Sequence, residues 1–93
     1  MASEVRASHI LVKTQDEANN ILNQIRGGKK FDKMAKKYSD CPSGKRGGDL
    51  GYFTRGRMVR EFEEAAFSMN VGQISAPIKT QFGYHIIMVT DKR

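Results

Sequence analysis

The sequence has one cysteine, no internal repeat and no long apolar run. Cys41 alone cannot form an internal disulfide and offers no zinc-site spacing, so packing has to stabilise the fold. No apolar stretch comes near the roughly 20 residues that span a bilayer, and the start of the chain carries Glu4 in place of an apolar signal segment. These absences disfavour secretion and membrane insertion, and they lead us to expect a cytoplasmic protein that binds no metal.

The composition is that of one ordinary globular domain. The 93 residues are 39% hydrophobic and 28% charged, which indicates neither disorder nor a fibrous repeat, so we expect a single domain over residues 1–93. Sixteen Lys and Arg residues against ten Asp and Glu residues give a net charge of +6. This balance favours anionic partners such as nucleic acid or lipid headgroups, although a solvated basic surface is the simpler interpretation.

The start of the chain shows clear periodicity. Residues 5–12 begin by alternating and then become apolar on both faces, as in a strand that moves to the middle of a sheet. Thr14 and Glu17 form a capping box, and the glycine pair at 27–28 is typical of a helix end. A strand followed by an amphipathic helix is therefore predicted.

The rest of the chain alternates between short apolar segments and turn residues. The expected elements are a helix over 31–38, a loop over 41–48 with room for one helical turn, a short strand over 49–54, a helix around 61–69 that ends at 71–72, an irregular strand over 74–79 and a strand over 84–89. Pro77 places the irregular strand at a sheet edge. The order predicts an α+β domain with an antiparallel sheet flanked by helices.

The two histidines each open an apolar strand. His9 precedes Ile10-Leu11-Val12, and His85 precedes Ile86-Ile87-Met88-Val89. If these strands are neighbours, the rings come within hydrogen-bond reach, one donating and the other accepting. A satisfied core pair is the simpler interpretation of either ring, whereas an acid/base role is the functional one.

Cys41 and a set of large apolar residues are the other candidates for a site. Cys41 precedes Lys45 and Arg46 in a polar loop, so a Cys/His hydrolase is an alternative, although a chain this short leaves little room for a cleft with oxyanion support. The apolar residues lie near glycine-rich turns and either line a small pocket or pack in the core. They are Leu50, Met58, Phe62 and Phe82.

Five segments in order resemble the parvulin family of peptidyl-prolyl cis/trans isomerases over essentially the whole chain. They are Ser8-His9-Ile10-Leu11-Val12-Lys13, Tyr38-Ser39-Asp40-Cys41-Pro42-Ser43, Gly47-Gly48-Asp49-Leu50-Gly51, Met58-Val59 with Phe62, and Phe82-Gly83-Tyr84-His85-Ile86-Ile87. The resemblance implies a βαααβαββ order, with a four-stranded antiparallel sheet surrounded by four helices, the third of them in the segment 43–48. It also implies a non-covalent isomerase without a cofactor.

The resemblance assigns roles to the candidate residues. Leu50, Met58 and Phe62 would hold the proline ring, and Phe82 would close the pocket beside the substrate. The family's catalytic floor maps onto His9, Cys41, Thr80 and His85. On this interpretation the histidine pair and Thr80 fix the pocket's shape and electrostatics, and Cys41 tunes them through a thiol hydrogen bond. The alternative is a non-enzymatic chaperone module that binds proline peptides in the same groove.

The resemblance also bears on partners. Phosphate-directed parvulins carry a basic insertion after the first strand, whereas here Lys13 runs straight into Thr14, so no phosphoserine or phosphothreonine requirement is expected. We expect a monomer acting on proline-containing polypeptides. A local surplus of positive charge around the expected site would tolerate or favour acidic residues that flank the proline, and it comes from Lys45, Arg46, Arg55, Arg57 and Arg60 against Asp49. The basic residues on the second helix are either a solvated face or a weak contact for an anionic partner, and they are Lys29, Lys30, Lys33, Lys36 and Lys37. A nucleic-acid-binding protein is the last-ranked alternative because the aromatic strand motifs of RNA-binding folds are missing.

Overall fold

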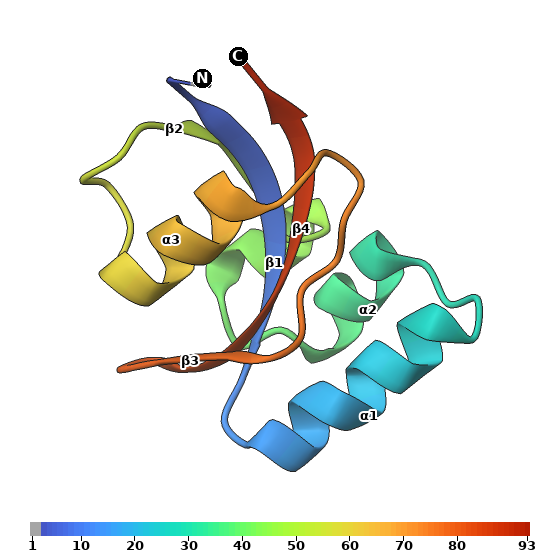
Figure 1. Ribbon diagram of the computed structural model, residues 1–93. Coiled ribbons are helices and arrows are strands. Elements are labelled where there is room, and N and C mark those ends of the chain that lie inside the picture. Colours follow the sequence, from blue (N-terminus) through green and yellow to red (C-terminus); the bar gives the residue numbers. More distant parts are fainter. Residues whose placement is uncertain (1–2) are drawn as a thin grey trace.

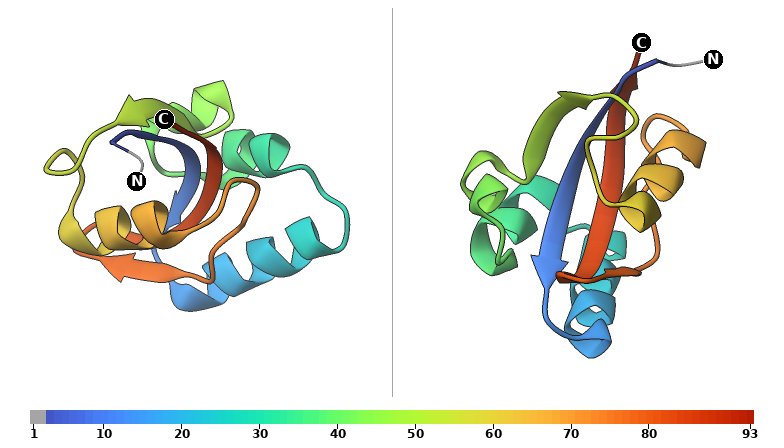
Figure 2. Two further views of the ribbon diagram at one scale, coloured as in Figure 1. Left: turned by 45° about the horizontal axis from the view of Figure 1, so that its top comes forward. Right: turned by 90° about the vertical axis from the view of Figure 1, so that its left-hand side faces the viewer.

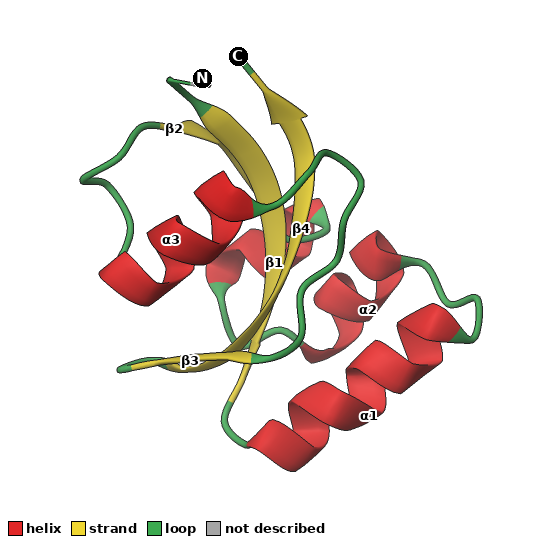
Figure 3. Ribbon diagram, in the orientation of Figure 1, coloured by secondary structure: helices red, strands yellow, loops and turns green. Residues whose placement is uncertain are grey.

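Residues 3–93 are described by a computed structural model (Figures 1 and 3). The elements follow in the order β1 (Val5–Val12), α1 (Gln15–Arg26), α2 (Phe31–Tyr38), a 3-10 helix η1 (Pro42–Arg46), β2 (Asp49–Phe53), α3 (Arg60–Ser68), β3 (Ile78–Thr80) and β4 (Gly83–Lys92). This is the predicted βαααβαββ order of an α+β domain, with the third helix a short 3-10 helix. No helix within 3–93 is long and apolar enough to cross a bilayer.

The strands form one antiparallel sheet in the order β2-β1-β4-β3. β1 and β4 are the long central pair, running side by side in Figure 1, with Ile10 opposite Ile86 and Leu11 opposite His85. β3 pairs with β4 alone and lies at the edge, as Pro77 predicted, but it covers only Ile78–Thr80 and not the expected 74–79, where Ile74 makes an isolated bridge to Met88. The first and last described residues also meet, since the Ser3 and Glu4 amides both donate to the carbonyl of Arg93.

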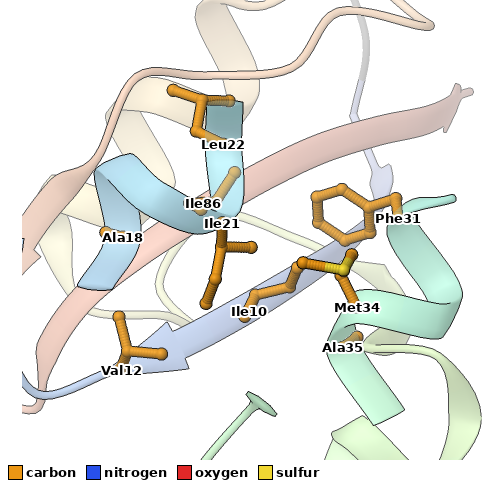
Figure 4. Packing of buried hydrophobic residues seen from close by; sticks show 9 residues of the cluster. All are labelled: Ile10, Val12, Ala18, Ile21, Leu22, Phe31, Met34, Ala35 and Ile86. Atoms are coloured by element: carbon orange, nitrogen blue, oxygen red, sulfur yellow. The ribbon is translucent and has the colours of Figure 1, made fainter. Parts of the chain in front are cut away.

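Two apolar clusters cover opposite faces of the sheet, because successive side chains of a strand point to opposite faces. One joins α1 and α2 to the sheet through Ile10, Val12, Ala18, Ile21, Leu22, Phe31, Met34, Ala35 and Ile86 (Figure 4). The other joins α3 to the sheet through Val5, Ala7, Phe53, Phe62, Ala66, Met69, Ile87 and Val89. In the right-hand view of Figure 2, α3 lies on one side of the strands and α2 with η1 on the other. Successive residues of β1 therefore pack alternately towards α1 and α2 on one face and towards α3 on the other.

Helix ends follow the local chemistry, with one departure from the prediction. Thr14 caps α1 by accepting from the Glu17 amide, and Gly28 takes the left-handed conformation after the helix (φ 114°). The prediction that the third amphipathic helix reaches 71–72 is wrong, because α3 ends at Ser68. The backbone of Met69 is extended and its side chain is buried in the cluster on the α3 face, so core packing ends the helix early.

Candidate active site

A pocket of about 500 Å³ opens on the α3 side of the sheet. Its lining comes from β1, β2 and β4, the turn between β3 and β4, the start of η1 with the loop before it, and α3 with the segment that leads into it. The residues are His9, Leu11, Asp40, Cys41, Pro42, Leu50, Arg57, Met58, Val59, Phe62, Phe82 and His85. The lining thus contains all four residues predicted to bind the substrate and three of the four predicted for the floor, while Thr80 lies outside it.

The histidine pair forms the floor of this pocket. Because His9 lies opposite Ile87 and His85 lies opposite Leu11, the two histidines are diagonal neighbours on one face of the β1–β4 pair. Their Nδ1 atoms are 2.9 Å apart and their rings are nearly parallel, at 18°. Each histidine has a fractional exposure of 5% or less, so the pair is buried. The predicted hydrogen bond between the two histidines is confirmed in geometry.

Thr80 contacts the ring nitrogen of His85 that does not face His9. Its Oγ1 lies 2.7 Å from Nε2 of His85 and also accepts from the Phe82 amide at 3.1 Å. The hydroxyl therefore connects the floor to the turn that carries Phe82, although Thr80 itself does not line the pocket. Thr80, His85 and His9 are joined by two consecutive hydrogen bonds. The donors can all point from Thr80 towards His9 or all the other way, and in either arrangement each bond contains one proton.

Burial keeps both rings neutral. Desolvation, reinforced by the neighbouring His85, lowers the pKa of His9 from 6.5 to about 4. Desolvation also lowers the pKa of His85. The Nε2 atom of His9 is buried and has no hydrogen-bond partner within residues 3–93, which further disfavours a charged ring. At neutral pH the floor is therefore polarisable but uncharged.

Phe62 brings α3 onto the histidine pair. Its ring is edge-on to both imidazoles, with centroid distances of 5.5 Å to His9 and 5.3 Å to His85. The side chain is almost fully buried in the cluster that attaches α3 to the sheet. Phe62 therefore packs in the core and lines the pocket at the same time. The sequence left these two roles open as alternatives, and the structure shows both.

Gly48 holds the pocket's β2 side against β1. Its carbonyl accepts from the His9 amide at 3.0 Å, and a Cβ atom added at Gly48 would lie 2.3 Å from the carbonyl oxygen of His9. Its φ of 86° is also one that glycine adopts far more readily than other residues. This close approach places Leu50, two residues later, in the pocket wall.

Cys41 lies in the wall rather than in the floor. Its thiol sulfur accepts from the Ser43 hydroxyl at 3.3 Å, and the described residues give it no hydrogen bond to either histidine. The expected thiol hydrogen bond to the histidine network is therefore not seen. A sulfur without a base as hydrogen-bond partner also lacks the activation that a Cys/His hydrolase needs.

Several lining residues were not singled out by sequence reasoning. Leu11 could have been found, because it lies two residues after His9 and so points to the same face of β1. Asp40, Pro42 and Val59 occur within the recognised segments, but no pattern gave them a role. Arg57 was counted only as one of several local positive charges, and its place in the lining depends on tertiary structure.

Metal chemistry has no obvious site in the described part of the chain. Within residues 3–93, no group of three or more His, Cys, Asp or Glu side chains is placed to hold a metal ion. The site therefore offers an apolar pocket over a neutral hydrogen-bonded floor. Such a site suits binding of an apolar ring with exclusion of water.

Comparison with known sequences finds one family of proteins similar to this chain. The family model described as "PPIC-type PPIASE domain" matches residues 8–91. The foldase protein PrsA of Exiguobacterium sibiricum is 59% identical over 92 residues, which cover 97% of this chain and 30% of PrsA. The foldase protein PrsA of a Geobacillus species is 54% identical over 90 residues, which cover 96% of this chain and 33% of that protein. The chain thus spans about a third of the length of these curated relatives.

Solved structures agree with the sequence matches. The crystal structure of the peptidylprolyl isomerase PrsA from Bacillus anthracis superposes with a TM-score of 0.95 at 46% identity, covering 99% of this chain and 43% of that one. The solution structure of NmPin, the parvulin of Nitrosopumilus maritimus, superposes with a TM-score of 0.87 at 49% identity. That likeness covers 98% of this chain and 99% of NmPin.

Proposed function

The chain belongs to the PPIC-type family of peptidyl-prolyl isomerase domains, and on that basis we propose that it accelerates X-Pro rotation by a non-covalent mechanism. Its substrates are then proline-containing peptides and folding polypeptides. The observation that carries the proposal is the pocket itself, in which Leu50, Met58 and Phe62 surround a floor formed by His9 and His85.

The geometry accounts for catalysis without a covalent step. Rotation about an X-Pro amide crosses a barrier of about 18–20 kcal/mol because the C–N bond loses its resonance. The planar amide is more polar than the twisted one, so a pocket that excludes water around the proline ring disfavours the planar ground state. Each 1.36 kcal/mol of differential binding gives about a tenfold rate increase. A neutral floor serves this purpose better than a charged one, which would draw water into the pocket.

An isomerisation assay tests the proposal. Cis-to-trans conversion of short X-Pro peptides is followed by NMR exchange without a coupled protease. Acceleration above the uncatalysed rate supports the enzyme, and acceleration that disappears in Phe62→Ala while the fold persists assigns it to this pocket. Peptide binding without acceleration would support the non-enzymatic chaperone module in its place.

We further propose that the reaction requires no phosphate on the substrate. Only Lys13 and Thr14 separate β1 from α1, which leaves no room for the basic loop that phosphate-directed relatives carry there. Peptides that differ only in serine or phosphoserine before proline test this point. A strong preference for the phosphorylated peptide would overturn it.

A separate proposal concerns the lysines on and before α2. All of them are exposed, and no ion pair within residues 3–93 involves them: Lys29, Lys30, Lys33, Lys36 and Lys37. We propose that this surface binds an anionic partner weakly. Binding to anionic vesicles or RNA should fall as salt rises and on reversal of these charges. The monomeric state and the cytoplasmic location stay predictions, to be checked by sedimentation and by cell fractionation.

A further inference from the structure

Arg57 differs from the neighbouring arginines because it lines the pocket. Arg55 lies 3.7 Å from a carboxylate oxygen of Glu63, and Arg60 lies 2.9 Å from Glu64. Arg57 is exposed and takes part in no ion pair within residues 3–93. Its positive charge at the pocket is therefore available to a ligand.

The loop that carries Arg57 is attached to α3 at two points by one carboxylate. One oxygen of Glu63 accepts from the Gly56 amide, and the other lies 3.7 Å from the Arg55 guanidinium. The Glu63 side chain is only 17% exposed, so both contacts are partly shielded from water. Arg57 and Met58 follow directly after this attachment, which holds the backbone of Arg57 beside the pocket.

The position of Arg57 suits a neighbour of the bound proline. Consecutive Cα atoms are about 3.8 Å apart, both along this loop and along a bound peptide. Arg57 and Met58 are consecutive and both line the pocket, so if Met58 contacts the proline ring, the long side chain of Arg57 can reach a side chain next to that proline. The lining around it is mostly apolar, so an ion pair there is less screened than one on an open surface.

The opposite charge in the lining is Asp40, on the wall that also contains Cys41. Asp40 faces a second hollow as well, of about 350 Å³, which Lys36 and Lys45 also line. With two lysines and one carboxylate lining this hollow, the side chains around Asp40 carry no net negative charge. Arg57 thus contributes a positive charge to the pocket that no nearby group in the lining fully cancels.

We propose that Arg57 selects substrates in which a residue directly next to the proline carries a carboxylate, that is, Glu or Asp. The carboxylate of that residue pairs with the guanidinium while the proline ring occupies the pocket. This inference rests on the isomerase function proposed above and adds a substrate class to it.

A charge-exchange experiment tests the inference. Peptides that differ only in Glu, Gln or Lys, placed either before or after the proline, are assayed with the wild type, Arg57→Glu and the control Arg26→Glu. Arg26 is exposed in the last turn of α1, outside the pocket lining, and the control changes the net charge by the same amount. An exposed ion pair changes binding by about threefold, and attraction of Glu combined with repulsion of Lys gives about tenfold.

The expected result is about a tenfold preference for Glu over Lys in kcat/KM of the wild type, at one of the two positions. Arg57→Glu should invert this ratio, and Arg26→Glu should keep it. An unchanged ratio in Arg57→Glu would overturn the inference, and so would an equal change in both variants, because the overall charge would then explain the preference.

The Gln peptides separate this inference from the proposed function. If the wild type does not accelerate their isomerisation, the isomerase proposal fails. The dissociation constants of the Glu and Lys peptides, measured by NMR titration, still decide the role of Arg57 in that case. If the Gln peptides are turned over but no charge preference appears, the inference about Arg57 alone fails.

Discussion

His9 and His85 lie diagonally across the two central strands with their Nδ1 atoms 2.9 Å apart, and both rings are buried. The hydrogen bond between the two Nδ1 atoms needs at least one neutral ring, because two imidazolium rings would repel and neither Nδ1 could accept. The shape of the pocket floor is therefore coupled to pH.

Stability should fall on mild acidification. The folded pKa of His9 is lowered to about 4, against 6.5 in the unfolded chain. The unfolded state thus binds more protons between these values, and the stability that His9 contributes is complete above pH 6.5 and declines as the pH falls towards 4. At pH 5 the loss from His9 is about 2 kcal/mol, and the lowered pKa of His85 adds to it in the same direction.

Urea unfolding at pH 7.5 and pH 5.0 measures this loss. The variant His9→Phe should be less stable than the wild type at pH 7.5, since it removes a hydrogen bond. Its free energy of unfolding should however fall less between pH 7.5 and pH 5.0. This interval lies above the usual carboxylate pKa, which keeps ion pairs such as Arg6–Asp49 out of the comparison. An equal loss in wild type and variant would contradict the assignment.

Gly48→Ala should destabilise the protein far more than Gly56→Ala. Both glycines have positive φ, 86° and 89°, which an alanine adopts at a cost of roughly 1–2 kcal/mol. An alanine Cβ at Gly48 would also lie 2.3 Å from the His9 carbonyl oxygen, whereas at Gly56 nothing lies within 4 Å. We expect losses of about 4 kcal/mol and about 1 kcal/mol respectively.

Chemical unfolding at neutral pH checks this difference. The surviving folded fraction of Gly48→Ala should also show altered amide chemical shifts at His9, because the substitution acts on that residue's backbone. Similar losses in the two variants would show that β2 moves away from β1 at little cost.

Most of the fold could be predicted from local patterns, because each element carries its own periodicity. Val5–Val12 alternates and then becomes fully apolar, and it proves to be a central strand. Pro77 predicted the edge position of the strand expected over 74–79, although the strand itself begins only after the proline, at Ile78. The exact end of α3 could not be predicted, since it depends on Met69 finding space in a core made by distant residues.

The site was predictable only in part. Histidines at the starts of two apolar strands indicated a pair, but their diagonal placement depends on the β1–β4 register, which contains an irregularity between Arg6 and Ala7. The separate role of Arg57 was hidden within a local surplus of positive charge. Only tertiary contacts show that Arg55 pairs with Glu63 while Arg57 reaches the pocket.

Phe62→Leu should reduce activity much more than stability. The substitution removes the ring that stands edge-on to both histidines, yet keeps most of the buried volume, so we expect a stability loss of about 1–2 kcal/mol. Activity should fall about tenfold or more, because the pocket then encloses the proline less completely.

Phe31→Leu is the matched control for this effect. Phe31 is 6% exposed and belongs to the cluster on the opposite face of the sheet, so its loss of stability should be similar while kcat/KM stays within about twofold. Rates of X-Pro isomerisation and urea midpoints of both variants provide the comparison. Equal loss of activity would mean that Phe62 acts only through overall stability.

Cys41→Ser and Cys41→Asp distinguish the non-covalent mechanism from nucleophilic attack. The thiol lies in the pocket wall and its sulfur accepts from the Ser43 hydroxyl, without a histidine as hydrogen-bond partner. A hydroxyl at this position fills almost the same space and can accept the same bond, so Cys41→Ser should retain isomerase activity within about fivefold, a change of about 1 kcal/mol. Cys41→Asp places a carboxylate in the wall and should retain measurable activity, because no step requires a covalent bond to sulfur. Full loss of kcat/KM in both variants, with urea midpoints close to that of the wild type, would support a nucleophilic Cys41, since only that mechanism needs the thiolate itself.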